Sequence, residues 1–140
     1  MPRPMMTALI CRFPVFPRQL FLPALGSRHR PDMCPPKHLR EGLPPFLTFA
    51  GGADHAIPVS EMEEFHQALK AKGIPSELYI GNQGKHGFCN GRNPYNRFFY
   101  WSISLADQFL VKHGILEGVS NMTIPKEVKQ LKENDFQVYQ

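Results

Sequence analysis

The chain has 140 residues, of which 42% are hydrophobic and 20% charged, so it is long enough and apolar enough for one modest folded domain. Its formal net charge of +4 is unevenly spread: residues 1–44 carry seven basic and two acidic side chains, and residues 45–140 carry nine basic and ten acidic ones. The near-neutral body argues against a nucleic-acid partner, and no apolar run approaches the roughly 18 residues of a membrane helix, so we expect no membrane partner either.

Residues 1–36 form a segment rich in proline and arginine, in which we expect no regular structure. Proline removes backbone hydrogen-bond donors, and this opposes both helices and central strands. Arg12 interrupts the apolar stretch MMTALIC, which is too short for the core of a signal peptide. We therefore divide the chain into an irregular segment, 1–36, an ordered body, 37–116, and a polar tail, 117–140.

The ordered body begins with a strand, a helix and a second strand. FLTFA, residues 46–50, is a short apolar run closed by Gly51-Gly52, which is typical of a buried strand. Ser60 is the expected N-cap of a helix that ends near Gly73. The side chains expected on its buried face are Met62, Phe65, His66 and Leu69. SELYI, residues 76–80, is the second expected strand.

A longer helix is expected after the second strand. Asn93 and Pro94 are a natural N-cap and first helical residue, and the helix would run to about His113, with Gly114 as its stop. Its expected buried face carries Phe98, Trp101, Leu105 and Phe109. In the polar tail we expect one more short helix after Pro125.

The order of these elements brings two polar residues together. A strand–helix–strand unit of this length predicts parallel strands joined by a right-handed crossover. Asp54 follows the first strand and His86 follows the second, so both lie at the carboxyl edge, where open α/β sheets place their sites. A carboxylate there can accept a hydrogen bond from the imidazole Nδ1, which leaves the other ring nitrogen to act as a general base toward a serine.

These residues also resemble a known family. PPFLTFAGGADHAIPVSEMEEFHQALKAKGIPSELYIGNQGKHGF, residues 44–88, looks like the C-terminal part of an α/β-hydrolase. The similarity extends over about residues 37–125 and is strongest to esterases of acetyl-xylan and other carbohydrates, with dienelactone hydrolases and prolyl-oligopeptidase-type peptidases as relatives. The resemblance implies an α/β fold: a partial α/β-hydrolase with two parallel strands, a crossover helix and a C-terminal helix.

The resemblance also implies an activity. It assigns Asp54 as the acid and His86 as the base of a serine hydrolase's catalytic triad, with a small-molecule ester as substrate and no cofactor. The family also needs a nucleophile in a G-x-S-x-G turn. None of the serines lies in such a turn; they are Ser27, Ser60, Ser76, Ser102, Ser104 and Ser120. We therefore expect the chain to be inactive alone.

Three interpretations of the chain follow from the missing motif. In the first interpretation, the chain is a truncated or frame-disrupted hydrolase, in which residues 1 to about 36 are non-native sequence or a damaged remnant. Alternatively, it is one half of an enzyme whose N-terminal half is a separate chain. As a third interpretation, it is a non-catalytic binding protein that retains part of the fold. In a fragment, the open edge of the first strand would also favour self-association.

Other reactive residues have simpler explanations. Three cysteines without a C-x-x-C pair indicate neither a disulfide framework nor a zinc site. Cys89 lies three residues from His86, but a Cys–His pair would also need oxyanion donors, which are not evident. His55 is expected on the loop surface and His66 in a hydrogen-bonded core position. Helical spacing favours core packing for Trp101 over a sugar-stacking surface.

Overall fold

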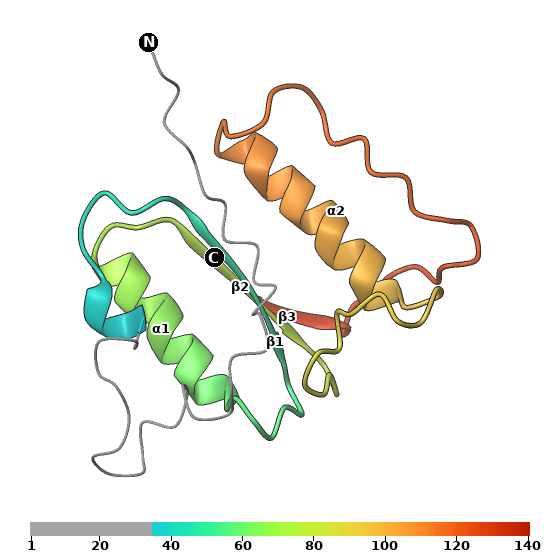
Figure 1. Ribbon diagram of the computed structural model, residues 1–140, viewed down its shortest axis with the longest axis horizontal. Coiled ribbons are helices and arrows are strands. Elements are labelled where there is room, and N and C mark those ends of the chain that lie inside the picture. The colour runs from blue at the N-terminus through green and yellow to red at the C-terminus, as the bar shows by residue number, and fades with distance from the viewer. Residues whose placement is uncertain (1–34) are drawn as a thin grey trace.

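The structure is a computed structural model that describes residues 35–140. These residues form three strands, two α-helices and a short 3-10 helix (Figure 1). In chain order the elements are the 3-10 helix η2 (Pro35–His38), β1 (Phe46–Gly51), α1 (Val59–Ala71), β2 (Ser76–Gly81), α2 (Arg97–Lys112) and β3 (Phe136–Tyr139). The expected irregular segment lies outside the described residues, apart from its last two. No helix within residues 35–140 is long and apolar enough to cross a membrane.

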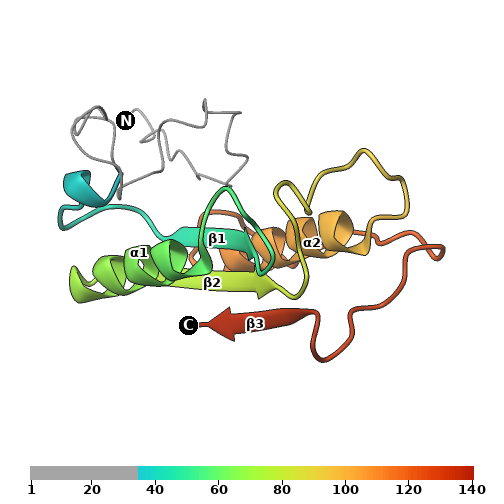
Figure 2. The ribbon, with the colours of Figure 1, turned by 90° about the horizontal axis from the view of Figure 1, so that it is seen from below.

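The strands form one sheet in the order β1-β2-β3. β1 and β2 are parallel and run in register from Phe46 opposite Ser76 to Gly51 opposite Gly81, which confirms the expected crossover unit. Both strands therefore end at the same edge, and the loops that follow them lie next to each other (Figure 2). β3 is antiparallel to β2.

The sheet is covered by one helix on each face (Figure 1). On the α1 face, Ala50 of β1 and the β2 residues Leu78 and Ile80 pack with Met62. On the opposite face, Leu47 and Tyr79 pack with Ala106 and Phe109 of α2. This division follows from the two-residue period of a strand, which sends alternate side chains to opposite faces. The chain thus forms a helix–sheet–helix sandwich with a core on each side.

Helix α1 largely has the expected buried face, but it begins earlier than the sequence predicts. Met62, His66 and Leu69 are buried, and the half-buried Phe65 packs edge-on against Phe46. The prediction of Ser60 as N-cap is wrong, because the helix begins at Val59 and Pro58 occupies the capping position without a side-chain hydrogen bond.

Helix α2 begins later than expected. The prediction of an Asn93-Pro94 start is wrong: the helix begins at Arg97, and Asn96 caps it by accepting a hydrogen bond from the Phe98 N–H. Asn93 instead forms the turn before the helix, where its side chain accepts from the Tyr95 N–H and its carbonyl accepts from the Asn96 N–H. Within α2, Phe109 is buried as expected, whereas Phe98, Trp101 and Leu105 are only partly buried.

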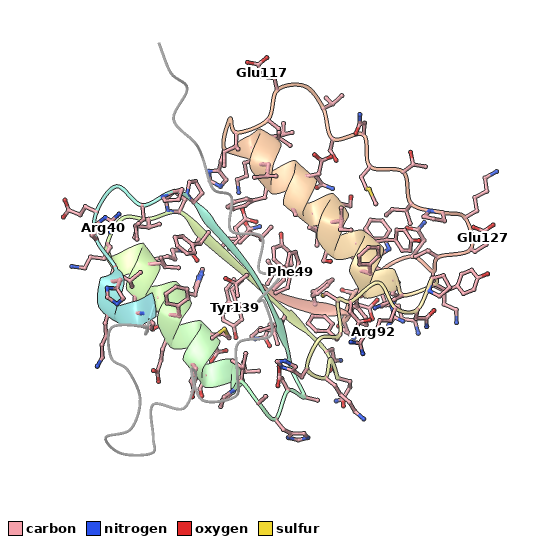
Figure 3. All side chains as sticks on the ribbon, viewed as in Figure 1. Arg40, Phe49, Arg92, Glu117, Glu127 and Tyr139 are labelled. Carbon is pink, nitrogen blue, oxygen red and sulfur yellow. The ribbon has the colours of Figure 1, made fainter. Side chains whose placement is uncertain are left out.

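The polar tail contains a strand rather than the expected helix after Pro125. β3 pairs with β2, and the ring of Phe136 at its start packs at a tilt against Phe49 and edge-to-face against Tyr79, with ring centroids 6.0 and 5.8 Å away. Phe49 lies between the sheet and α2, whereas Tyr139 lies on the α1 side (Figure 3), where its hydroxyl donates to Glu63 at 2.6 Å. Aromatic contacts with distant residues thus favour an extended tail over a local helix.

Candidate active site

Asp54 and His86 meet at the carboxyl edge of the sheet, as the strand order predicts. Asp54 lies in the loop after β1, and His86 lies in the turn after β2. Their side chains are joined by a hydrogen bond of 3.0 Å between Asp54 Oδ2 and His86 Nδ1. The two residues are 32 positions apart in the sequence, so the parallel pairing of β1 and β2 is what brings them together.

The two loops approach each other closely because glycines stand where they touch. The Ala53 N–H donates to the Gly84 carbonyl at 2.9 Å, and the Gly52 N–H donates to the Gly81 carbonyl at 2.8 Å. A Cβ atom on Gly51 would lie 2.3 Å from the Gly84 oxygen, closer than non-bonded atoms can come. A Cβ atom on Gly52 would lie 3.0 Å from the Gly81 oxygen, so Gly51 and Gly52 are needed for the close approach of the two loops.

The carboxylate of Asp54 is held by its own loop. Its side chain is only 8% exposed. Oδ1 accepts hydrogen bonds from the backbone N–H groups of Ala56 at 2.7 Å and Ile57 at 3.1 Å. With Oδ1 occupied in this way, Oδ2 is directed toward the imidazole, and the carboxylate is fixed before any substrate is present.

The imidazole of His86 is held mainly through its backbone. The side chain is 65% exposed. His86 lies inside a turn closed by a hydrogen bond from the Phe88 N–H to the Lys85 carbonyl, and Gly87 follows with a φ of 72°. The ring of Phe88 covers Gly81, where a Cβ atom would lie 2.3 Å from it. Phe88 therefore anchors the turn to the end of β2.

This geometry suits general-base chemistry. An ionised carboxylate can only accept a hydrogen bond, so the bond to Asp54 places the proton of a neutral imidazole on Nδ1. Nε2 then carries the lone pair that can take a proton from a hydroxyl group or from water. Asp54 would also stabilise the imidazolium that forms.

None of the serines of the described chain is hydrogen-bonded to His86. Ser76 is hydrogen-bonded to His66, Ser102 donates to the Phe99 carbonyl, and Ser120 donates to Asp107. Ser60 and Ser104 lie in α1 and α2, and Ser27 is outside the described residues. Within residues 35–140, Asp54 is thus the hydrogen-bond partner of the His86 side chain, and no serine is in place as its nucleophile.

Cys89 does not take the place of the serine. Burial raises the pKa of its thiol to about 12, although a hydrogen bond with Ser102 acts in the opposite direction. At neutral pH such a thiol is protonated, and a thiol reacts as a nucleophile through its thiolate. The Cys–His interpretation is therefore not supported by the structure.

The other residues that the sequence analysis considered are His66, His55 and Trp101, and none of them is part of the Asp54–His86 pair. His66 is buried, its Nδ1 lies 2.8 Å from Ser76 Oγ, and burial together with Lys70 lowers its pKa, so it is a core histidine as expected. His55 is exposed. Trp101 donates through Nε1 to the Lys129 carbonyl at 3.2 Å, which ties α2 to the tail.

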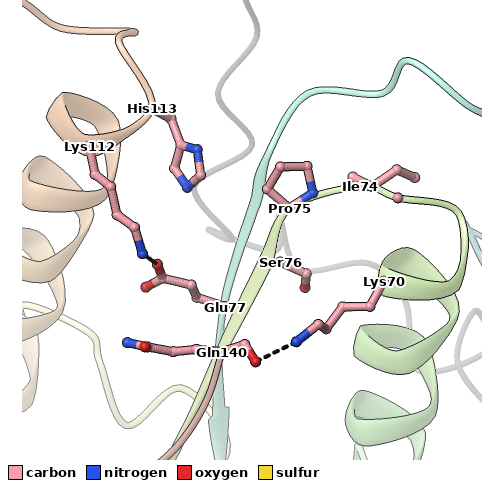
Figure 4. A pocket seen from close by; sticks show the side chains of 9 residues that line it. Lys70, Ile74, Pro75, Ser76, Glu77, Lys112, His113 and Gln140 are labelled. Carbon is pink, nitrogen blue, oxygen red and sulfur yellow. Dashed lines mark hydrogen bonds and ion pairs between the residues drawn. The ribbon is translucent and has the colours of Figure 1, made fainter.

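A surface hollow lies at the other end of the sheet (Figure 4). It is lined by Lys70, Gly73, Ile74, Pro75, Ser76, Glu77, Lys112, His113 and Gln140. Both of its lysines are already paired, Lys112 with Glu77 at 2.6 Å and Lys70 with the Gln140 carbonyl. Because it adjoins the amino end of β2, it takes no part in the Asp54–His86 site. Residues 35–140 also contain no cluster of ligands suited to a metal ion.

Two residues that support the site were not found from the sequence. Asn90 and Asn96 follow His86 and hydrogen-bond to backbone carbonyls of its turn. An Asn-Gly pair at 90–91 and an asparagine before a helix are common turn and capping signals. They indicate local structure, but only the folded chain shows that both residues contact the segment that carries His86.

Comparisons with known proteins show to which family the chain is similar. Residues 26–107 match the prolyl oligopeptidase family. Among solved structures, the chain is similar to esterase 2 of the planctomycete Thermogutta terrifontis. The sarin-phosphonylated form is 35% identical, with a TM-score of 0.60 over 68% of this chain and 34% of the esterase. The apo form is 32% identical, with a TM-score of 0.63 over 72% of this chain and 41% of the esterase. The chain thus spans well under half of the esterase's length. No curated protein matches the sequence.

Proposed function

Since the chain belongs to the prolyl oligopeptidase family, we propose that Asp54 and His86 are the acid and the base of a serine-dependent ester hydrolase. The chain has part of the α/β-hydrolase fold, with a parallel strand pair and helices on both faces of the sheet. The observation that carries the proposal is the 3.0 Å hydrogen bond between Asp54 Oδ2 and His86 Nδ1. It joins residues 32 positions apart at the sheet edge where such folds place their sites.

In the proposed reaction, His86 Nε2 removes the proton from a serine hydroxyl as its oxygen attacks the ester carbonyl. Asp54 holds the imidazole in the required tautomer and stabilises its charged form. His86 then returns the proton to the leaving alcohol, and the acyl group stays bound to the serine. In the second half of the reaction, His86 removes a proton from water as it attacks the acyl-serine, and returns the proton to the serine as the acid leaves. This chemistry needs no cofactor.

The serine comes from outside the 140 residues, because the sequence contains no G-x-S-x-G turn. We therefore expect the chain to have no esterase activity alone. The exposure of the His86 ring, 65%, is consistent with a site that has one wall open to a further segment.

The substrate we propose is a small ester with a short acyl group. Thermogutta terrifontis esterase 2 has been solved with propionate bound and with butyrate bound. Over the matched parts this chain is 36% and 29% identical to those two structures. The acyl pocket itself would be formed with residues outside this chain.

A second candidate is a binding protein that retains the fold without catalysis. It is favoured by one observation, the absence of the nucleophile motif from the sequence. It predicts that the Asp54–His86 pair has no catalytic effect even when a nucleophile is supplied.

A chimaera distinguishes the two candidates. Residues 37–140 would be joined to the part of Thermogutta terrifontis esterase 2 that precedes its matched segment, and hydrolysis of p-nitrophenyl acetate would be measured. We expect turnover by the chimaera and none above buffer by the 140-residue chain. Asp54→Asn in the chimaera should lower kcat by about 10⁴-fold, because the imidazole then takes the wrong tautomer.

The matched control is His55→Asn, which changes an exposed ring beside Asp54 and should leave turnover unchanged. Circular dichroism and a cooperative melt would establish that each chimaera is folded. A folded chimaera whose turnover survives both Asp54→Asn and His86→Ala would refute the proposed catalytic roles. A folded but inactive chimaera would favour the binding protein.

A further inference from the structure

The turn that carries His86 has an anchor on helix α2. Asn96 lies at the N-cap of α2, and its side-chain amide donates to the backbone carbonyls of Phe88 and Asn90, both at 2.8 Å. Its Oδ1 accepts a hydrogen bond from the Phe98 N–H at 3.1 Å. One side chain thus joins the start of α2 to the backbone that immediately follows His86.

A series of hydrogen bonds links the backbone of the turn to Asn96. The Gly87 carbonyl accepts from both the backbone N–H of Asn90, at 3.0 Å, and its side-chain amide, at 2.5 Å. The carbonyl of Asn90 is in turn held by Asn96. The carbonyls of Gly87, Phe88 and Asn90 are therefore all fixed, directly or through one neighbour, by the amide of Asn96.

His86 depends on this backbone more than a buried residue would. With 65% of its side chain exposed, the ring has few packing contacts to set its position. Its orientation toward Asp54 must follow largely from the turn between Lys85 and Phe88. A displacement of that turn by a fraction of an ångström would lengthen the 3.0 Å bond to Asp54.

We propose that Asn96 is a positioning residue for His86, which holds the turn in the conformation that keeps the imidazole on Asp54. The catalytic consequence rests on the proposed function, but the link between Asn96 and the turn does not. The two amide hydrogens of Asn96 hold the turn, whereas its Oδ1 caps the helix. The two roles can therefore be separated by substitution.

Asn96→Asp separates them most sharply. Aspartate keeps an oxygen that can cap α2 and is among the preferred N-cap residues. It has no amide hydrogens to donate, and its second oxygen would face the carbonyls of Phe88 and Asn90. Asn96→Ser also keeps a capping oxygen and adds no charge, so it shows whether the loss of the two amide hydrogens is sufficient. Asn96→Ala removes both roles.

Two NMR measurements on the full 140-residue chain test the proposal: the ring ¹⁵N chemical shifts of His86, which report its hydrogen bond to Asp54, and amide hydrogen exchange. In Asn96→Asp and Asn96→Ser we expect the His86 ring shifts to move toward those of Asp54→Asn, whereas a residue that only caps α2 would leave them unchanged.

The exchange rates of the Phe88 and Asn90 N–H groups report on the turn that carries His86. Those of the Phe99 and Tyr100 N–H groups report on the start of α2. In Asn96→Asp and Asn96→Ser we expect exchange in the turn to be about tenfold faster, with exchange in α2 within about twofold of the original chain. In Asn96→Ala both regions should exchange faster.

Gln108→Gly is the matched control, because it weakens α2 at an exposed position far from the turn along the helix. It should accelerate exchange in α2 alone. The proposal is overturned if the N–H groups of the turn exchange in Asn96→Asp at the rate of the original chain. It is also overturned if exchange in the turn and in α2 accelerates equally in Asn96→Asp, because that is the result expected of a residue that only caps the helix. Neither result depends on enzymatic activity, so a failure here is distinct from an inactive chimaera.

Discussion

The loop that carries Asp54 (residues 52–57) and the turn that carries His86 (residues 82–90) hold their functional side chains in different ways. The Asp54 carboxylate is 8% exposed and accepts two backbone hydrogen bonds from its own loop. The His86 ring is 65% exposed, and its turn is held from outside by Asn96. A carboxylate that must stay in one orientation is served by local hydrogen bonds. A base that must exchange protons with other groups needs an open ring on a supported backbone.

The largest expected effect on stability comes from the contact between the loop and the turn. Gly51→Ala would place a Cβ atom 2.3 Å from the Gly84 oxygen, and the loops would have to separate to make room. We expect a loss of about 3 kcal/mol in the free energy of unfolding, at the upper end of overpacking effects. Urea unfolding followed by circular dichroism would measure it.

Gly114→Ala is the control for that substitution. Gly114 has a φ of 67° and open space around it, so alanine there costs only the left-handed conformation, about 1 kcal/mol. Equal losses for the two variants would show that the close approach of the loops does not contribute to stability.

A smaller loss of stability is expected from removing Asp135, a residue of the tail that contacts the start of the His86 turn. Asp135 forms a two-point ion pair with Arg97, at 2.6 and 2.9 Å, and its carbonyl accepts from the Asn82 N–H at the start of the turn. We expect Asp135→Ala to lower the free energy of unfolding by about 2 kcal/mol. Glu133→Ala, which removes an exposed acid nearby, should have little effect.

The same ion pair predicts a dependence on pH. Hydrogen bonds from Arg97 hold the pKa of Asp135 below its ordinary value of 3.8. The unfolded chain therefore binds this proton more readily, so the contribution is present above about pH 4 and is lost as the pH falls below it. The difference in stability between the original chain and Asp135→Ala should shrink between pH 5 and pH 2. A constant difference would contradict the role assigned to the ion pair.

The smallest expected effect comes from the buried histidine, His66. Burial, with a contribution from Lys70, lowers the pKa of His66, so the folded state favours the neutral ring that pairs with Ser76. Because the folded pKa is below the ordinary 6.5, this contribution is complete above pH 6.5 and is lost as the pH falls. Melting temperatures of the original chain should therefore fall more between pH 7.5 and pH 5.5 than those of His66→Asn. An equal fall would contradict this.

The sequence predicted the elements whose signals are local. β1 and β2 are apolar runs bounded by glycine and proline, and their parallel pairing follows from the helix between them. That pairing is sufficient to predict from the sequence that Asp54 lies beside His86. The catalytic roles assigned to the two residues remain a prediction, because geometry shows their adjacency and not their activity.

The elements that were missed depend on distant residues. β3 is held by pairing with β2 and by aromatic contacts of Phe136 with Phe49 and Tyr79. The polar sequence around β3 indicates none of these contacts. At the start of α2, Asn93-Pro94 gives a stronger local capping signal than Asn96. Asn96 is the cap in the structure, where its amide also meets the carbonyls of Phe88 and Asn90.

The most direct test of the account is the protonation of His86 in the intact chain. The ring ¹⁵N chemical shifts of His86 would be measured by NMR at a pH where the imidazole is neutral, in the original chain and in Asp54→Asn. We expect the proton on Nδ1 in the original chain, because Asp54 Oδ2 can only accept, and on Nε2 in Asp54→Asn. The same tautomer in both proteins, or a proton on Nε2 in the original chain, would show that Asp54 does not hold His86 as the proposed acid of this pair.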